Sequence, residues 1–470
     1  MQKNPNRNKK IVPKWNKKEQ KGTKRTGPNG SKKETKRTGP NGSQWVSKKG
    51  ENRMNEEIQE KSNYCLNCKI KPCSNKGCPL NNDIPAFIKK IKEQNYEEAY
   101  KILSKTTVLQ PICGRICPHK KQCQGSCVRG IKGEPVSIGK MEAFVGDYGI
   151  KNNLQIEKNV VERLLDRKVA VVGGGPAGLT CAAFLARRGL NVTIYERNPF
   201  LGGLLMYGIP DFRLSKKIVE DTVEKILNLG IDVKYNQELG KNLRLENLEK
   251  EYDYIYLAFG ANVSTKMGID GEQLAGVFGG NELLEKSGHP DYTGKTVIVN
   301  GGGNVAIDVA RTVKRKGAKD VIIVYRRAKE QMPAEEKEVE DAEKEGIKIW
   351  FQNNIVKING LEKVENVELI KTKLIQKEGE SRLSPVNIEG SNFIQNADYV
   401  IMALGSKTDK FVENLNLNLD SKNYICVNEK FQTSNPKIYA GGDLIGGNGT
   451  VAWAARNGRD AAEEILNRLH

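Results

Sequence analysis

Cysteine is the residue type whose spacing most clearly suggests chemistry in this chain. Eight of its ten cysteines lie between Tyr64 and Val128, in two groups of four. The first group has the spacing C-x2-C-x4-C-x4-C and consists of Cys65, Cys68, Cys73 and Cys78. The second group consists of Cys113, Cys117, Cys123 and Cys127. Soft thiolate ligands clustered in this way bind zinc or iron–sulfur clusters.

Two details of the spacing favour iron–sulfur clusters over zinc. Zinc modules built on C-x2-C motifs need two such pairs, and only Cys65 and Cys68 form one. Bacterial ferredoxins end a cysteine run with Cys-Pro, and that last cysteine binds the other cluster of a two-cluster protein. Cys78 and Pro79 repeat this arrangement. The spacing therefore predicts iron–sulfur chemistry.

A glycine motif indicates a second kind of chemistry. It lies in KVAVVGGGPAGLTCAAFLARRGLNVTIYE, residues 168–196, between an apolar run and a helix-compatible segment. The G-x-G-x-x-G residues are Gly173, Gly175, Pro176, Ala177 and Gly178. Such glycines permit a tight turn and let the backbone approach a pyrophosphate, which would face the amides opening the helix. Glu196 closes the second strand, where it can accept a hydrogen bond from a ribose hydroxyl, so NAD or FAD binding is predicted.

A related motif begins at Lys295 and predicts a second nucleotide. The residues of its G-x-G-x-x-A turn are Gly301, Gly303, Asn304, Val305 and Ala306. Here the second strand ends in Arg326 and Arg327 instead of an acid. An acid would repel a 2′-phosphate, whereas arginine pairs with it, so this unit is expected to bind NADP(H). The alternative is two solvated arginines after a strand.

These motifs require strand–helix–strand units that position the turns at the edge of a parallel sheet. Residues 252–260 and 397–405 read as two further strands, each with the same Ala-x-Gly ending. Near the C-terminus, Asp443 follows a strand, where it can bind a sugar-like chain, and Thr450 opens a final helix. The helix N-terminus at Thr450 would stabilise negative charge on a reduced flavin.

Length and charge bound the class of protein. The 470 residues suffice for two or three domains. Residues 1–53 carry +14 of the net charge of +19 and are expected to be disordered. This tail either binds polyanions non-specifically or is a solvated extension. No apolar run approaches a membrane span, and the N-terminus lacks an apolar signal segment. We therefore expect a cytoplasmic protein, in which clustered cysteines bind metal or do redox chemistry.

Two other mechanisms fit the residues poorly. A thioredoxin reductase needs a C-x-x-C pair in its NADP domain, and only Cys181 and Cys426 follow the cysteine groups. A mechanism based on histidine is also disfavoured, because the chain has only three histidines. Hydride transfer between cofactors needs no protein acid or base, so we expect no catalytic side chain.

Five stretches together resemble the small subunit of NADPH-dependent glutamate synthase. They are VAVVGGGPAGL, YERNPFLGGLLMYGIPDFRL, VNGGGNVAIDVA, VYRR with MPAEE, and IYAGGDLIGGNGTVAWAARNGRDAA. The same module occurs in dihydropyrimidine dehydrogenase and in NADH-dependent ferredoxin:NADP oxidoreductase. The resemblance implies an α/β fold with two Rossmann-like domains, the NADP domain inserted in the FAD domain. The expected segments are a disordered basic tail (1–60), a helical double [4Fe-4S] domain (61–165), the N-terminal segment of the FAD domain (166–292), the NADP(H) domain (293–405) and the C-terminal segment of the FAD domain (406–470).

The resemblance also implies which residues hold the cofactors. One [4Fe-4S] cluster would be held by Cys65, Cys68, Cys73 and Cys127. The other would be held by Cys78, Cys117, Cys123 and a non-cysteine ligand that matches Glu142. Cys113 would then be a bystander, although it remains an alternative fourth ligand. FAD would lie on the first glycine turn, and the residues closing around it would be Gly203, Arg213, Gly442, Asp443 and Thr450.

The activity implied is that of an electron-transfer subunit of the glutamate synthase small-subunit type. NADPH would reduce FAD, and electrons would pass through the two clusters to a large subunit or another acceptor protein. A hetero-oligomer is therefore expected, without a membrane partner. The same module could instead supply electrons in a ferredoxin:NADP oxidoreductase or a dihydropyrimidine dehydrogenase. A polyanion-binding protein with a vestigial redox body is a distant alternative, which absence of flavin would favour.

Overall fold

The computed structural model describes residues 48–285, 288–377, 379 and 382–469. Most of the tail expected over residues 1–60 lies outside the described residues. The end of that segment differs from the expectation, because helix α1 spans Lys48–Asn63. Ile58 and Ser62 are buried near the end of this helix. Burial of these two side chains anchors the C-terminal end of the helix.

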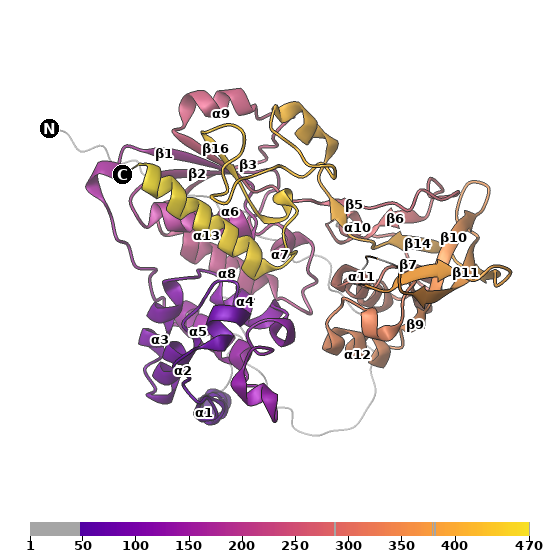
Figure 1. The fold of residues 1–470 in the computed structure, drawn as a ribbon, viewed down its shortest axis with the longest axis horizontal. Helices are drawn as coiled ribbons and strands as arrows, with labels where there is room; N and C mark the ends of the chain where they lie inside the picture. Colours follow the sequence, from indigo (N-terminus) through magenta and orange to yellow (C-terminus); the bar gives the residue numbers. More distant parts are fainter. Residues whose placement is uncertain (1–47, 286–287, 378, 380–381, 470) are drawn as a thin grey trace, which may run out of the picture. The chain divides into compact units, whose positions relative to one another are not determined.

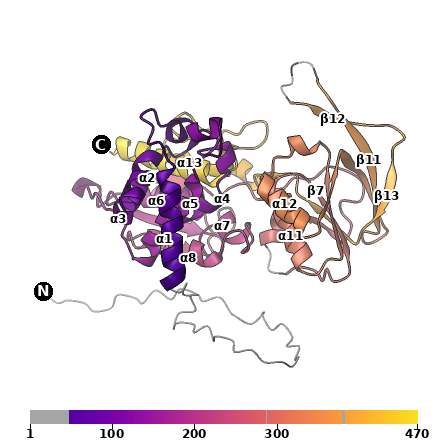
Figure 2. The ribbon, with the colours of Figure 1, turned by 90° about the horizontal axis from the view of Figure 1, so that it is seen from below.

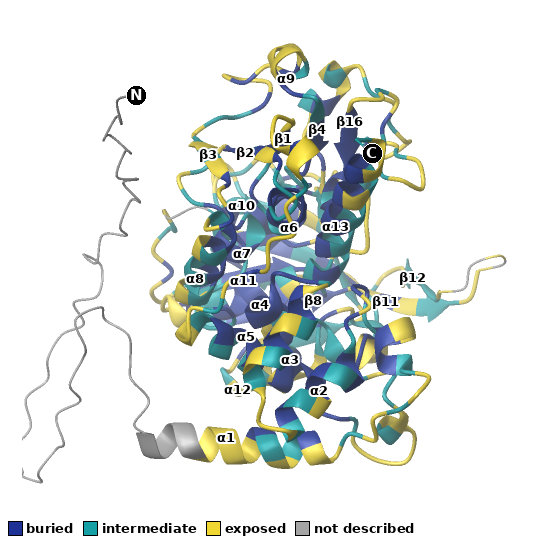
Figure 3. Cartoon of the chain, turned by 90° about the vertical axis from the view of Figure 1, so that its left-hand side faces the viewer, coloured by how far each residue is buried: buried dark blue, intermediate teal, exposed yellow. Residues whose placement is uncertain are grey.

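The first sheet carries the first glycine motif. Its five parallel strands have the order β16–β4–β1–β2–β3. Strands β1, β2, β3 and β16 are labelled in Figure 1. Their bounds are Ile438–Ala440, Tyr254–Leu257, Lys168–Val172, Asn191–Glu196 and Asp232–Tyr235. Apolar runs without alternation are typical of strands covered on both faces, and the apolar residues of β1 are fully buried. Figure 3 shows β4 and β16 in the buried colour.

Helices α6 (Pro176–Ala186) and α13 (Val451–Arg468) pack closely together beside this sheet. A Cβ on Gly458 would meet the Ala177 carbonyl oxygen at 2.1 Å, so the glycine permits the close approach. The other elements of this domain are α7 (Leu204–Tyr207), α8 (Lys216–Leu227), α9 (Leu245–Glu251), and the short 3-10 helices Glu162–Leu164, Lys410–Leu415 and Gly442–Ile445.

The second sheet lies in the chain between β4 and β16, which confirms that one dinucleotide domain is inserted in the other. Its parallel order is β6–β14–β7–β8–β9. The bounds are Val277–Gly279, Tyr399–Met402, Thr296–Asn300, Asp320–Tyr325 and Lys348–Phe351. Its helices are α10 (Gly280–Glu285), α11 (Asn304–Arg315) and α12 (Glu336–Lys344), with a 3-10 turn at Lys329–Gln331. Because β6 pairs with β14, this sheet begins before residue 293, where we had placed the boundary.

An antiparallel sheet follows β9, and the sequence reasoning did not anticipate it. Its strand β11 pairs with β10, β12 and β13. The four strands are β10 (Asn353–Asn359), β11 (Asn366–Ile375), β12 (Ser384–Asn387) and β13 (Phe393–Asn396). Two short strands, β5 (Val263–Ser264) and β15 (Ser406–Lys407), pair where the chain enters and leaves the inserted domain.

The cysteine-rich segment is helical. Its elements after α1 are α2 (Ile84–Lys92), α3 (Tyr96–Ser104), α4 (Gln110–Ile116), α5 (Ile138–Lys151), a π-helical turn at Cys73–Gly77, and 3-10 turns at His119–Lys121 and Val128–Ile131. Phe87, Ile88 and Met141 are fully buried between these helices. Helix α4 contacts both α8 and α13, so the segment packs on the first dinucleotide domain (Figure 2). Among the described helices, none has the length and apolar composition needed to cross a membrane.

Candidate functional site

A cavity of about 310 Å³ lies where β1, β2 and β4 end. Ligands of open parallel sheets bind at this edge, and the volume is within the range of cofactor pockets. Of the residues predicted from the sequence, the cavity is lined by Gly173, Gly175, Pro176, Ala177, Glu196, Gly203, Arg213, Asn304, Val305, Gly442, Asp443 and Thr450. It is not lined by Gly178, Gly301, Gly303, Ala306, Arg326 or Arg327.

The first glycine turn has the geometry that its sequence predicts. Gly173 has φ +104°, and a Cβ there would lie 2.5 Å from the Ala258 carbonyl oxygen. A Cβ on Gly178 would lie 1.9 Å from the Gly173 carbonyl oxygen, so α6 can approach the turn only with glycine there. Gly178 is therefore a packing residue below the cavity. Gly175 faces the backbone of Gly203, whose Cα would be 3.9 Å from an added Cβ.

Glu196 is buried at the end of β2 and shapes this turn. One carboxylate oxygen accepts a hydrogen bond from the Gly174 amide at 2.8 Å, and the other accepts from the Asn198 amide at 2.9 Å. Burial raises the pKa of Glu196, and the two amide hydrogen bonds oppose the shift. Each oxygen keeps a second lone pair for a ribose hydroxyl, as predicted for an acid at this position.

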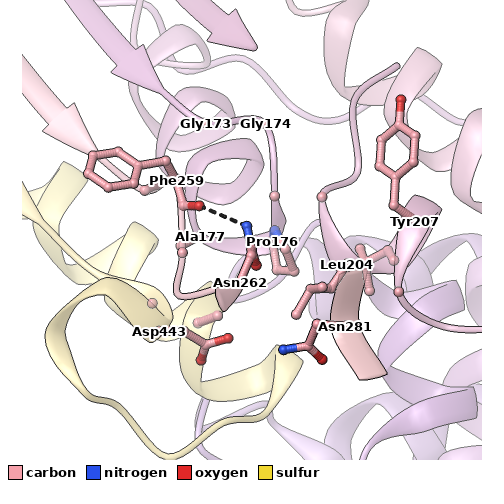
Figure 4. A pocket seen from close by; sticks show the side chains of 18 of the residues that line it. Gly173, Gly174, Pro176, Ala177, Leu204, Tyr207, Phe259, Asn262, Asn281 and Asp443 are labelled. Carbon is pink, nitrogen blue, oxygen red and sulfur yellow. Dashed lines mark hydrogen bonds between the residues drawn. The ribbon is translucent and has the colours of Figure 1, made fainter. Parts of the chain in front are cut away.

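Asp443 lines the same cavity (Figure 4). Within the described part of the chain its carboxylate has no hydrogen-bond partner, and burial raises its pKa. Asn281 extends its side chain toward the same space from α10. Thr450 caps α13 by accepting a hydrogen bond from the Trp453 amide at 3.4 Å. A polyhydroxyl chain would supply the donors that the Asp443 carboxylate lacks.

Arg213 lines the cavity, but its guanidinium group is already paired. Its Nη1 donates to Asp308 Oδ2 at 2.6 Å, and its Nε lies 3.4 Å from Glu338. The side chains of Arg213 and Asp308 are only 9% and 5% exposed. Burial raises the pKa of Asp308 to about 7, although Arg213 opposes the shift. Arg213 thus joins the first domain to α11 of the second.

The aromatic neighbour of Arg213 strengthens the same contact. The guanidinium groups of Arg311 and Arg315 lie 4.7 and 4.0 Å from the centre of the Phe212 ring. Such cation–π contacts contribute about 0.5–1 kcal/mol each at exposed sites and more when they are buried. The loop before α8 is therefore a docking element between the two nucleotide-binding domains.

At the second glycine turn, Gly301 is tightly packed against the backbone, whereas Gly303 borders open space. A Cβ on Gly301, which has φ +145°, would lie 2.2 Å from the Ala403 carbonyl oxygen. A Cβ on Gly303 would have no neighbour within 4 Å among the described residues. Gly303 precedes the first residue of α11, so this open space faces the helix N-terminus, where a pyrophosphate can bind.

Arg326 and Arg327 follow β8 directly, as predicted. The Arg326 carbonyl accepts a hydrogen bond from Thr372 Oγ1 at 2.8 Å, and the Arg327 carbonyl accepts from the Gln352 amide at 3.1 Å. The backbone is therefore fixed, whereas neither guanidinium group has an ion-pair partner within the described residues. The Nε of Arg327 is buried without a hydrogen-bond partner. A buried unpaired donor costs about 1–3 kcal/mol, and a phosphate would remove this cost.

The structure brings together the four cysteines of the first expected cluster. Cys65, Cys68, Cys73 and Cys127 line one small cavity, whose other lining residues are mostly apolar. Burial raises the pKa of Cys73 to about 11 and also raises the pKa of Cys65. Ionised thiols are therefore unfavourable here unless a cation compensates their charge. Iron provides that charge, so this set of ligands fits an iron–sulfur cluster.

The second set also converges, although its members are far apart in the sequence. Cys78, Cys117 and Cys123 lie near Glu142. Burial and then the negative charge of Glu142 raise the pKa of Cys78 and of Cys123. The pKa of Cys117 is raised mainly by its hydrogen bond with Cys113 and by burial, with a smaller contribution from Glu142. Burial raises the pKa of Glu142 itself to about 8. Its Oε1 accepts a hydrogen bond from Asn82 at 3.2 Å. Four acidic groups gathered in a buried site can ionise together only if a cation compensates their charge.

Cys113 lies close to this second set. Its buried side chain is hydrogen-bonded to the Cys117 thiol, so geometry leaves both Cys113 and Glu142 as candidates for the fourth ligand. Among the described residues, no group of three or more His, Cys, Asp or Glu side chains is arranged to hold a single metal ion. The prediction that the two thiol sets hold iron–sulfur clusters is therefore supported by the convergence and burial of their side chains.

The second thiol set adjoins the large cavity. Ile116 and Pro118, on either side of Cys117, line the cavity, and a backbone hydrogen bond links Cys117 to Ala452 at the start of α13. By contrast, no cysteine of the first thiol set lines the cavity, whereas Cys78 and Cys123 of the second set pack in the same apolar cluster as Cys65, Cys73 and Cys127 of the first set. The arrangement therefore orders the sites as cavity, second thiol set and first thiol set.

Several cavity residues were missed by the sequence reasoning. Asn262, Asn281 and Asp308 line it, and Asn262 Nδ2 donates to the Phe259 carbonyl at 3.4 Å (Figure 4). The Ala-x-Gly sequence that follows β4 could have indicated Asn262, because it marks a loop at the carboxyl end of the strand, where ligands of parallel sheets bind. Asn281 and Asp308 belong to the inserted domain, and no local pattern marked them.

Comparisons with known proteins agree with this arrangement. Residues 167–458 match the family model of the pyridine nucleotide-disulphide oxidoreductases. Residues 44–154 match the model described as dihydropyrimidine dehydrogenase domain II, 4Fe-4S cluster. A solved structure of Mycobacterium tuberculosis FprA in complex with NADPH has a TM-score of 0.58 at 20% identity, covering 65% of this chain and 84% of that chain. This likeness shows the fold.

Curated relatives cover nearly the whole chain. The small chain of glutamate synthase [NADPH] from Escherichia coli is 35% identical, over 88% of this chain and 92% of its own length. The corresponding chain from Halomonas elongata is 32% identical, over 88% and 91%. The beta subunit of NADP(+)-dependent formate dehydrogenase from Moorella thermoacetica is 34% identical, over 84% of this chain and 59% of its own. The chain therefore belongs to the pyridine nucleotide-disulphide oxidoreductase family, in the group of glutamate synthase small chains with an N-terminal 4Fe-4S domain.

Proposed function

We propose that this protein is the NADPH-oxidising subunit of a glutamate synthase-type enzyme, in which electrons pass from NADPH through FAD and two [4Fe-4S] clusters to a larger partner subunit. The observation that carries the proposal is the placement of the second thiol set against the cavity. An NADPH oxidase without a protein acceptor would have no use for that contact.

The large cavity fits FAD. Its first glycine turn would hold the pyrophosphate, Glu196 would accept from the ribose, and the unpaired Asp443 carboxylate would accept from the ribityl hydroxyls. The N-terminus of α13 at Thr450 would face the flavin ring, where its dipole favours negative charge. FAD supplies the capacity to accept a hydride and to release single electrons.

The inserted domain fits NADPH. The open space at Gly303 and the N-terminus of α11 would hold its pyrophosphate, with the 2′-phosphate on Arg326 and Arg327. Asn304 and Val305, from the same turn, line the large cavity, so a nucleotide on this turn is directed toward the flavin site. The chain's residues bind and orient the two cofactors, and none is needed as an acid or base.

The two thiol sets would hold two clusters in series. Cys78, Cys117 and Cys123 would hold the cluster beside FAD, with Glu142 as the proposed fourth ligand. Cys65, Cys68, Cys73 and Cys127 would hold the outer cluster. One NADPH would reduce two one-electron acceptors, giving NADP⁺ and one proton. The formate dehydrogenase relative indicates that partners other than the glutamate-forming subunit are compatible with this module.

The experiment compares dye reduction with electron transfer to a partner. Anaerobically purified protein should oxidise NADPH with ferricyanide, because this half-reaction needs no partner. The Cys68→Ser variant should lose the outer cluster, about four irons per chain. It should keep its flavin and dye activity but lose glutamate formation when a glutamate synthase large subunit is added. Equal loss of both activities would contradict the proposed order of sites.

A further inference from the structure

Two loops beside the outer thiol set expose large apolar side chains. Ile70 is 82% exposed and Ile131 is 77% exposed, although both are isoleucines in a well-packed segment. Tyr64, Leu66 and Val128, which flank the same cysteines, are 40%, 50% and 38% exposed. We call these five residues the exit face. Isolated exposed apolar residues are ordinary, whereas a group of them marks an interaction surface.

The two loops of the exit face are joined to each other. The Arg129 guanidinium lies 4.3 Å from the centre of the Tyr64 ring, and its Nε donates to the Tyr64 carbonyl at 3.0 Å. Leu66 and Val128 line the same small cavity as the thiols of Cys65 and Cys127. Leu66 and Val128 therefore form part of the wall between this thiol site and the surface, through which an electron would leave, whereas Ile70 and Ile131 do not line the site.

The charge in the two loops of the exit face is predominantly basic, with the exposed carboxylates Glu60 and Glu134 at their ends. Residues 61–82 and 104–133 contain no Asp or Glu. Lys71 is paired with Asp83 at 2.6 Å. Lys69, Lys76 and Lys132 are exposed and have no ion-pair partner within the described residues. An apolar centre with an unpaired basic rim is typical of a surface that steers an oppositely charged protein.

We propose that the exit face is the docking surface for an acidic electron-acceptor protein, whose redox centre it brings next to the outer cluster. The proposal rests on the proposed function, since it assigns the partner of the outer thiol set. The charge complementarity requires carboxylates around the acceptor's redox centre. The apolar centre would exclude water and shorten the electron-transfer distance. Each acceptor molecule takes one electron, so two dock for each NADPH oxidised.

The test uses the complete holoenzyme and an acidic plant-type [2Fe-2S] ferredoxin as the probe. One variant is Lys69→Glu/Lys132→Glu and another is Ile70→Ser/Ile131→Ser. A matched control is Leu361→Ser/Lys373→Glu, because Leu361 is 92% exposed and both residues belong to the inserted domain. The readouts are the dissociation constant for ferredoxin at low and high salt, iron content, and NADPH oxidation with an uncharged quinone.

Both exit-face variants should bind ferredoxin at least about tenfold more weakly than the wild type, while the control binds normally. High salt should weaken ferredoxin binding by the wild type strongly, but should have little effect on binding by the Lys69→Glu/Lys132→Glu variant. Iron content and quinone reduction should stay unchanged in all three variants. Wild-type-like binding by the exit-face variants, equal loss in the control, or no binding by the wild type would overturn the proposal. Failure of quinone reduction in the wild type would instead overturn the proposed function.

Discussion

Replacing Arg327 with alanine should change the preference between NADPH and NADH. The side chain is half-buried, its Nε has no protein partner, and its backbone is fixed through Gln352. A charge-assisted contact with phosphate contributes about 1.5–3 kcal/mol. Because about 1.4 kcal/mol corresponds to tenfold, Arg327→Ala should lower kcat/KM for NADPH about tenfold to a hundredfold. Arg326 is exposed, so Arg326→Ala should cost about 1 kcal/mol or less.

The assay measures kcat/KM for NADPH and NADH with ferricyanide, in the wild type and in both variants. The effect on NADH should be small, because NADH lacks the 2′-phosphate. Thermal stability without nucleotide should not fall, since the substitution removes an unpaired buried donor. Arg244→Ala is a suitable control, because Arg244 is exposed and does not line the cavity. Equal losses for both nucleotides would refute the role of Arg327.

Three further predictions concern the Arg213–Asp308 contact between the domains and the inner cluster, which is the one that Cys78, Cys117 and Cys123 would hold beside FAD. Arg213→Ala should lower the free energy of unfolding by about 3–5 kcal/mol in urea denaturation, because it leaves Asp308 buried and unpaired; a loss below about 1 kcal/mol would show that the pair is weak. Cys117→Ser should remove the inner cluster and stop reduction of the outer cluster by NADPH, which electron paramagnetic resonance can follow; continued reduction would contradict the order of sites. Glu142→Gln should change the spectrum or potential of one cluster only, and if Cys113→Ser does so instead, Cys113 is the ligand.

Local patterns predicted the nucleotide turns well, because their geometry depends on neighbouring residues. Gly173 and Gly301 need positive φ, and their glycine spacing alone locates both turns. Glu196 was predictable for the same reason, since a strand end fixes the place of its carboxylate. The fold class and the inserted domain were also predicted and confirmed.

Long-range contacts could not be predicted in this way. Arg213 was expected to close around the flavin, and it lines the cavity, but no local pattern indicated that its guanidinium pairs with Asp308, 95 positions away in the sequence. Strand β6 has only three residues, which is too short for a recognisable periodicity. Its membership of the second sheet is evident only from its pairing with β14. The exit face was also missed, because exposure of Ile70 and Ile131 is decided by tertiary packing.

The most direct test of the proposed electron path is an anaerobic reduction with NADPH. Protein purified without oxygen should contain FAD and about eight irons per chain, the content of two [4Fe-4S] clusters. Added NADPH should bleach the flavin absorbance and produce the paramagnetic signal of a reduced iron–sulfur cluster. One tightly bound zinc without labile sulfide, or flavin bleaching that never yields a cluster signal, would contradict this electron path.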